Sequence, residues 1–200
     1  MKKKILVACL CVALAVLTVA GTTLAYLTSQ DTVTNTFTVG KVKITLDEAK
    51  VNDMGVVDTT ATSRVKENTY KLMPGHTYAK DPTVHVEAGS EACYVYVKVE
   101  NGLGNAEGGT KIAAQISAKG WIALNGVANV YYKEVAASDT VTDLVVFEKF
   151  TMADTVDATA LSALNNQTIV VTAYAIQKDG TGTAAEAWTK AGFGSTTSGN

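Results

Sequence analysis

Few residues in this chain of 200 could do chemistry, and the two histidines come first. A catalytic zinc ion needs three protein ligands that converge on it, and the chain has no His-Glu-x-x-His arrangement. His76 follows a Pro-Gly turn, where we expect it to be solvated. His85 stands between Val84 and Val86 in an extended segment, and it should face away from both. We therefore predict no metal site and no cofactor.

Cys93 is the next candidate, because a thiolate can act as a nucleophile. It alternates in phase with Val95, Val97 and Val99, which predicts a buried small hydrophobe with no reason to ionise. Cys9 and Cys11 lie in the first residues of the chain, which we read below as a leader. An exported domain that keeps one cysteine has no internal disulfide.

The remaining polar candidates are weak. Asp154 and Asp157 could share a calcium ion, but their spacing is common in loops and favours solvated side chains. Asn166-Gln167-Thr168 matches a glycosylation acceptor that only a eukaryotic secretory route would use. Gly-x-Ser-x-Gly and phosphate-binding glycine motifs are absent. We therefore predict that the protein is not an enzyme.

The first 25 residues read as an export signal. Three lysines (residues 2–4) precede an uncharged apolar run over residues 5–20, and Thr23-Leu24-Ala25 has the small-x-Ala form of a cleavage site. We place the cut between Ala25 and Tyr26, with Thr18-Val19-Ala20 as a second position. An uncleaved anchor over residues 5–27 is the alternative. With cleavage, the chain meets the membrane only transiently, through its leader.

The charge balance argues against nucleic acid as a partner. The full chain carries 17 basic and 19 acidic residues, and removal of the leader lysines lowers its net charge from −2 to about −5. A mildly acidic protein lacks the basic surface that binds phosphates.

The segments that would hold any site are mostly extended. Alternation predicts strands near residues 42–46, 81–86, 92–99, 121–124, 129–133, 142–152 and 168–177. Asn125-Gly126 predicts a hairpin, Pro74-Gly75 predicts a turn, and residues 168–176 are β-branched enough for a central strand. Residues 47–68 and 102–110 should be exposed loops, and residues 184–191, which include Trp188, should form a short helix.

These elements predict an all-β fold, a jelly-roll-like β-sandwich with one short C-terminal helix and a cleavable N-terminal signal helix. The expected organisation is a signal peptide over 1–25, a separate N-terminal segment over 26–37, the sandwich domain over 38–191 and a flexible tail over 192–200.

Three stretches resemble the TasA/camelysin family of exported proteins from Gram-positive bacteria. Residues 23–28 (TLAYLT) with 31–40 (DTVTNTFTVG) are similar to the family's leader and mature start. Residues 72–75 (LMPG) with 78–81 (YAKD) are similar to its turn, and residues 171–177 (VTAYAIQ) with Ala187-Trp188 are similar to its closing strand and helix. The resemblance implies a jelly roll, processing by a SipW-type signal peptidase and location in the extracellular matrix or at the cell surface.

The resemblance also implies assembly, since the best-known member forms biofilm-matrix fibres by lending its N-terminal segment to the next subunit. Here the donor candidate is residues 26–37, with Tyr26, Leu27, Val33 and Phe37 to fill pockets. The same segment could instead fold back onto its own domain or stay loose. Alternatives to a homopolymer are a monomeric adhesin that uses the loops at 47–68 and 102–110, and a secreted metallopeptidase, as camelysin-type relatives are labelled.

Overall fold

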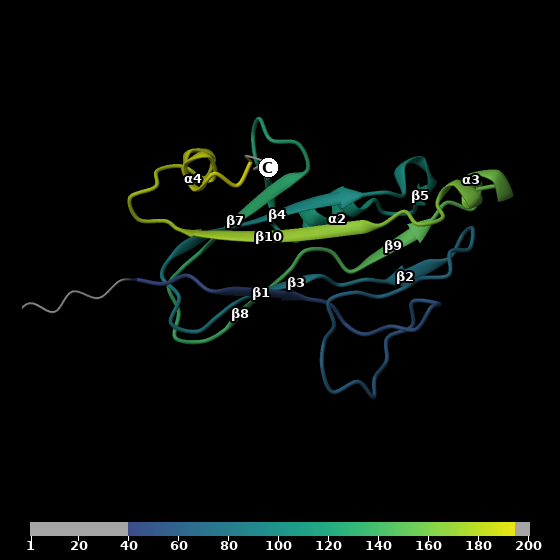
Figure 1. The fold of residues 1–200 in the computed structure, drawn as a ribbon, viewed down its shortest axis with the longest axis horizontal. Helices are drawn as coiled ribbons and strands as arrows, with labels where there is room; N and C mark the ends of the chain where they lie inside the picture. Colours follow the sequence, from purple (N-terminus) through teal and green to yellow (C-terminus); the bar gives the residue numbers. More distant parts are fainter. Residues whose placement is uncertain (1–39, 195–200) are drawn as a thin grey trace, which may run out of the picture. The chain divides into compact units, whose positions relative to one another are not determined.

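The computed structural model describes residues 40–194, and the fold below refers to these residues. They form three antiparallel sheets arranged as two layers (Figure 1). One layer has the strand order β10-β4-β7-β6, made of Ile169–Gln177, Cys93–Asn101, Val130–Val135 and Ile122–Ala123. This arrangement confirms the predicted all-β sandwich.

The second layer is built from two shorter sheets that continue into each other. The first has the order β1-β3-β8, made of Ile44–Asp47, Thr83–Val86 and Thr142–Val145. The other has the order β2-β9-β5, made of Thr77–Ala79, Lys149–Met152 and Glu107–Gly108. Backbone hydrogen bonds from Val146 to Pro82 and from Lys80 to Glu148 join them. The single strand predicted over 142–152 is therefore two strands, β8 and β9.

The main core lies between the two layers. Alternation along β4 sends Cys93, Val95, Val97 and Val99 into it, and all four are buried. The other face of β4 carries Tyr94 and Tyr96, which pack under α4. A strand that is apolar on both faces must be covered on both, and α4 supplies the second cover.

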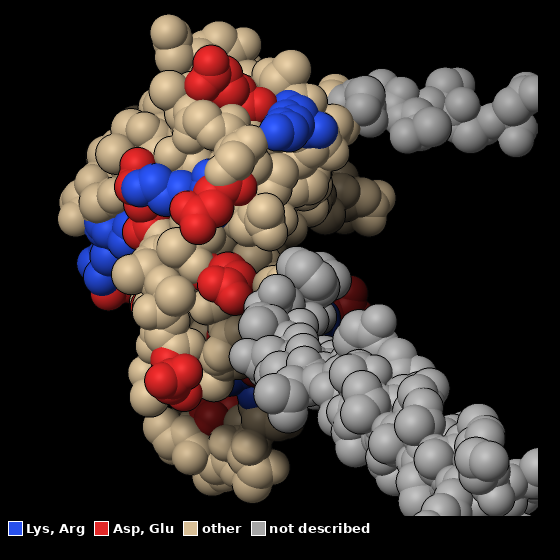
Figure 2. Space-filling model, turned by 90° about the vertical axis from the view of Figure 1, so that its left-hand side faces the viewer, with Lys and Arg blue, Asp and Glu red and all other residues tan. Residues whose placement is uncertain are grey.

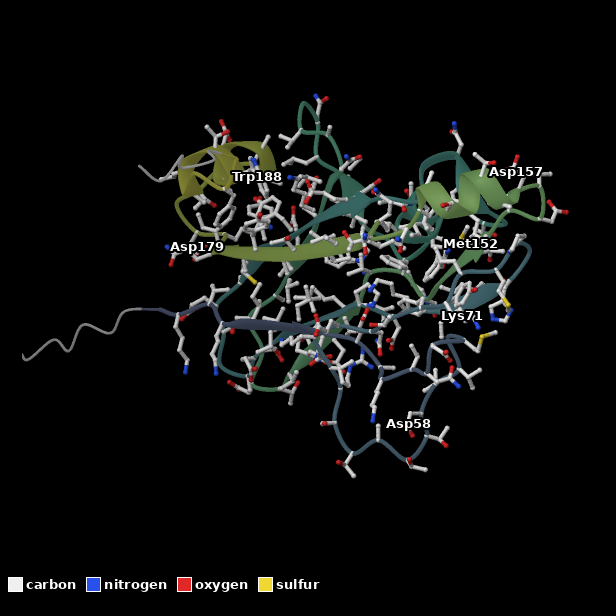
Figure 3. All side chains as sticks on the ribbon, turned by 45° about the vertical axis from the view of Figure 1, so that its right-hand side comes forward. Asp58, Lys71, Met152, Asp157, Asp179 and Trp188 are labelled. Atoms are coloured by element: carbon white, nitrogen blue, oxygen red, sulfur yellow. The ribbon has the colours of Figure 1, made fainter. Side chains whose placement is uncertain are left out.

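The helix α4 (Ala184–Ala191) confirms the predicted C-terminal helix. Thr183 and Glu186 form a reciprocal capping box at its start, and Gly192 ends it in the left-handed conformation. Trp188 lies between α4 and β10, where its ring meets Tyr174 edge-on (Figure 3). Packing continues past the helix, because Phe193 also contacts Trp188.

Two further short helices were not anticipated from the sequence. The helix α2 (Ile112–Ala118) buries Ile112 and Ile116 in the main core. The helix α3 (Ala158–Ala163) begins where the Asp157 side chain accepts a hydrogen bond from the Ala160 backbone. A short 3-10 helix, η1 (Gly104–Ala106), lies in the predicted loop over 102–110.

The predicted turn and the excursion after β1 are both present. His76 N donates to Met73 O across the turn, with Gly75 at a φ of 72°. Residues 49–69 leave the sheets as expected, and Asp58 lies at the far end of this excursion (Figure 3). The excursion is not exposed throughout, because Val51 and Glu48 are buried at its base.

Candidate functional site: two facing strand edges

The candidate site is the seam where edge strand β1 lies beside edge strand β10. Within residues 40–194, β1 pairs only with β3 and β10 pairs only with β4. The two edges also approach each other across the seam. The sequence predicted a central strand for β10, whereas this nine-residue strand is at the edge of its sheet and is half-buried along most of its length. Its composition is that of a strand with neighbours on both sides.

Backbone alternation shows which groups face the seam from β1. In an antiparallel ladder, successive residues direct their N–H and C=O groups to opposite sides. Glu87 N donates to Lys43 O, so the residues of β1 with odd numbers bond to β3. The backbone groups of Ile44 and Leu46 therefore point into the seam.

The same reasoning applies to β10. Lys178 N donates to Ala92 O and Gly102 N donates to Thr168 O, so the residues with even numbers bond to β4. The backbone groups of Ile169, Val171, Ala173 and Ala175 consequently face the seam. No described strand pairs with them there.

The seam is a groove with apolar walls. It has a volume of about 1300 Å3. The side chains that line it include half-buried apolar groups that pack on the main core, namely Ile44, Leu46, Leu72, Leu161, Leu164, Ile169 and Val171. Half-burial of so many large side chains means that the core is incompletely covered along this line.

The opposite seam of the sandwich is closed, which makes the open one distinctive. There α2 covers the core, and the Gln115 side chain bonds to Lys149 O and Glu148 N much as a neighbouring strand would. The Trp121 indole donates to Val145 O at 2.9 Å. Proteins protect exposed strand edges in this way, because unpaired edges recruit other strands.

The groove floor carries a buried ion pair near the end of β1. Lys80 Nζ lies 2.6 Å from Glu48 Oε2, and the two side chains are 11% and 5% exposed. Asn68 Nδ2 donates to Glu48 Oε1 and to Ala49 O. These contacts satisfy the carboxylate in a place where an unpaired charge would be strongly destabilising.

The residues predicted to act in processing and strand donation are Ala25, Tyr26, Leu27, Val33 and Phe37. All five lie outside the described residues. The structure instead supplies the edges that such a segment could meet. Sequence patterns did not reveal these edges, apart from the unusually apolar composition of β10.

The two histidines are placed apart and are both hydrogen-bonded. The prediction that His76 is solvated is wrong. Its Nε2 lies 3.0 Å from Met54 O, and its ring contacts Tyr78 edge-on. His85 faces away from the core as predicted. Its Nδ1 lies 2.6 Å from Asp143 Oδ1 and its Nε2 lies 3.0 Å from Asp47 Oδ1.

The carboxylates of Asp47 and Asp143 set the direction of the pKa shift of His85. Partial burial alone would lower its pKa, but hydrogen bonds to Asp47 and Asp143 outweigh burial and raise the pKa above the usual value. Burial likewise acts to raise the pKa of Asp47, yet His85 and Arg64 hold it below the usual value. His85 therefore links three strands, β1, β3 and β8, through its two ring nitrogens.

The other candidate residues serve structural roles. Cys93 is buried as predicted, and burial raises the pKa of its thiol. Asp154 and Asp157 are both exposed, and Asp157 caps α3. Asn166 follows α3 with a φ of 66° and lines the groove.

Acidic and basic residues are interspersed on the face drawn in Figure 2, so charge does not mark a second site on that face. Over the described residues, no helix is long and apolar enough to cross a membrane.

Comparison with known families finds a match. Residues 1–80 match the family model described as camelysin metallo-endopeptidase. The match covers 80 of the 200 residues and supports membership of the TasA/camelysin family. No curated protein and no solved structure matches it.

The family description implies a metal, and the described residues do not fit one. No group of three His, Cys, Asp or Glu side chains is placed to hold an ion within residues 40–194. A histidine that binds zinc uses one ring nitrogen for the metal and the other for a supporting acceptor. Both ring nitrogens of His85 already meet carboxylates, and His76 is on a different sheet.

Proposed function

We propose that the mature chain is an extracellular structural protein of the biofilm matrix or cell surface. In this proposal it forms fibres by lending residues 26–37 to the groove between β1 and β10 of the next copy. The observation that carries the proposal is the pair of unpaired strand edges that face each other across an apolar groove. An added strand would satisfy the backbone groups of the edge that it pairs with and cover the exposed part of the core.

The donor sequence suits this groove. In an extended strand every second side chain shares a face, so Leu27, Val33 and Phe37 would point the same way. Burial of each stabilises the contact by roughly 1.5–3 kcal/mol. The remaining residues of the segment are mainly Thr, Ser, Asn and Asp, which suit the solvent side of an outer strand.

The family match also bears on processing and location. Its members form a secreted or surface group, which supports an extracellular place for this chain. We propose that a SipW-type signal peptidase cuts between Ala25 and Tyr26 and frees the donor segment.

Electron microscopy and size-exclusion chromatography test the proposal on two chains, 26–200 and 38–200. The second retains every described residue. We expect filaments from the longer chain and monomers from the shorter one. Monomers from both at high concentration would contradict self-assembly and favour an adhesin that acts alone.

The family description favours one other function, a metallopeptidase. Because the described residues offer no metal centre, we propose that the chain is not an enzyme. A casein assay with and without chelator tests this, together with His76→Ala and His85→Ala. Hydrolysis that is lost with chelator and in either variant would contradict the non-enzyme assignment.

A further inference from the structure

The seam is blocked at one end by the chain itself. We call residues 64–68 the end segment. Val65 and Glu48 exchange two backbone hydrogen bonds, of 2.9 and 2.8 Å, on the seam side of β1. The Lys66 ammonium also donates to Leu46 O on that side. Another strand paired with β1 therefore cannot continue past Leu46.

The end segment is firmly anchored. Arg64 Nε donates to Asp47 Oδ1 at 2.5 Å, and its Nη atoms donate to Asp81 and Thr83. Asn68 is tied to Glu48 and Ala49. A segment held by several charge-assisted bonds is a fixed stop and would not be displaced easily.

At the other end of the seam, none of residues 40–194 closes the groove. A second hollow of about 470 Å3 lies there, and it is lined by residues that include Val42 and the end of β10 from Ala175 to Gln177. Gln177 is exposed. A chain can therefore leave the groove at this end.

We propose that the end segment sets the direction of the incoming strand. This inference rests on the proposed function, in which residues 26–37 of a second copy occupy the groove. That segment is joined to its own domain at residue 38. Its connected end must leave through the open end, so its free N-terminus lies against the end segment. The strand then runs antiparallel to β1 and, because β10 runs opposite to β1 (Figure 1), parallel to β10.

Length and charge agree with this direction. The nine residues of β10 span roughly 30 Å, which the 12 residues of the donor segment cover with a few left to reach its own domain. Glu67 lines the groove beside Lys66, and no described group pairs with its carboxylate. The α-amino group created by cleavage would bring a positive charge to this end.

The direction has a regulatory consequence. A copy that keeps its leader would have 25 further residues directed into the end segment, so it could not seat. The end segment thereby makes the groove selective for processed chains.

Disulfide trapping in trans tests the direction on the mature chain 26–200. One preparation carries Thr28→Cys, and it is mixed with a second that carries either Glu67→Cys or Gln177→Cys. The native Cys93 is buried, so background trapping should be low. We expect covalent dimers with the Glu67 variant and few with the Gln177 variant, and the reverse pattern would overturn the proposed direction.

A matched pair of insertions tests the stop independently. A short Ser/Gly extension before Tyr26 should raise the critical concentration for assembly at least about tenfold. The same residues inserted between Thr38 and Val39 should leave it nearly unchanged. If the extension leaves the critical concentration as nearly unchanged as the insertion does, the end segment does not act as a stop. If the unmodified chain 26–200 itself stays monomeric, the proposed function fails rather than the direction.

Discussion

A proline at position 173 should separate assembly from folding. Ala173 directs its backbone N–H into the seam, so Ala173→Pro removes no hydrogen bond to β4. Thr172 directs its N–H toward β4, where it pairs with Lys98. Thr172→Pro is therefore the matched control, since it breaks the ladder inside the domain.

The expected magnitudes follow from the lost bonds. In the fibre, Ala173→Pro would remove one bond to the donor and weaken its neighbours at Val171 and Ala175, each worth about 0.5–1.5 kcal/mol. The sum is roughly 2–4 kcal/mol, a rise of about 30- to 1000-fold in the critical concentration. Thr172→Pro leaves a carbonyl of β4 unpaired and should lower stability by about 1–3 kcal/mol, or roughly 3–10 °C in Tm.

Two assays separate the outcomes. Differential scanning calorimetry reports Tm on chain 38–200, and sedimentation of chain 26–200 reports the critical concentration. We expect Ala173→Pro to keep nearly the parental Tm and to lose assembly. Assembly at the parental concentration by a folded Ala173→Pro chain would refute the assignment of β10 as an accepting edge.

Two further predictions concern the elements around the groove. Because the pKa of His85 is raised in the folded state, its contribution to stability is complete below about pH 6.5 and is lost as pH rises through the raised pKa. Asp47 has a lowered pKa in the folded state, so its contribution to stability is lost as pH falls through that lowered pKa. Thermal melts from pH 3 to 9 should show both losses of stability. His85→Gln should remove the loss at alkaline pH. Lys80→Met leaves the buried Glu48 carboxylate without its cationic partner, so the free energy of unfolding should fall by about 3–5 kcal/mol. The double variant Lys80→Met with Glu48→Met should recover most of this loss. An equal loss in the single and double variants would contradict the stabilising role of the ion pair.

The sequence predicted the parts of the fold that local patterns determine. Alternation located β3, β4 and β10, and it placed Cys93 in the core beside Val95. The helix α4 was predicted, and its capping box shows why it begins at Ala184. These features depend on residues close together in the chain.

Sequence signals for the two short helices α2 and α3 are present in the chain. Asp157 precedes the apolar and small residues of α3 and caps them, and an Asp immediately before such residues is a signal for a helix N-terminus. In α2 the four-residue spacing of Ile112 and Ile116 gives one helical face. Both helices are shorter than the patterns that sequence periodicity detects well.

The groove could not be predicted, because it depends on topology. The strands β1 and β10 lie near opposite ends of the described chain and are brought together only by the topology of the folded domain. The apolar composition of β10 predicted a central strand, but composition does not determine how many neighbours a strand has, and β10 is a half-buried edge strand. The buried Glu48 is a similar case, since its partner Lys80 reaches it only through the packing of β1 against the β2–β3 segment.

Binding of the donor segment to the groove tests the central claim most directly. A synthetic peptide of residues 26–37, labelled at its C-terminus, would be titrated with chain 38–200 and followed by fluorescence anisotropy. We predict saturable one-to-one binding that Ala173→Pro abolishes and that a scrambled peptide does not reproduce. No binding of the peptide to the folded parental chain, or equal binding by Ala173→Pro, would contradict strand donation into the seam between β1 and β10.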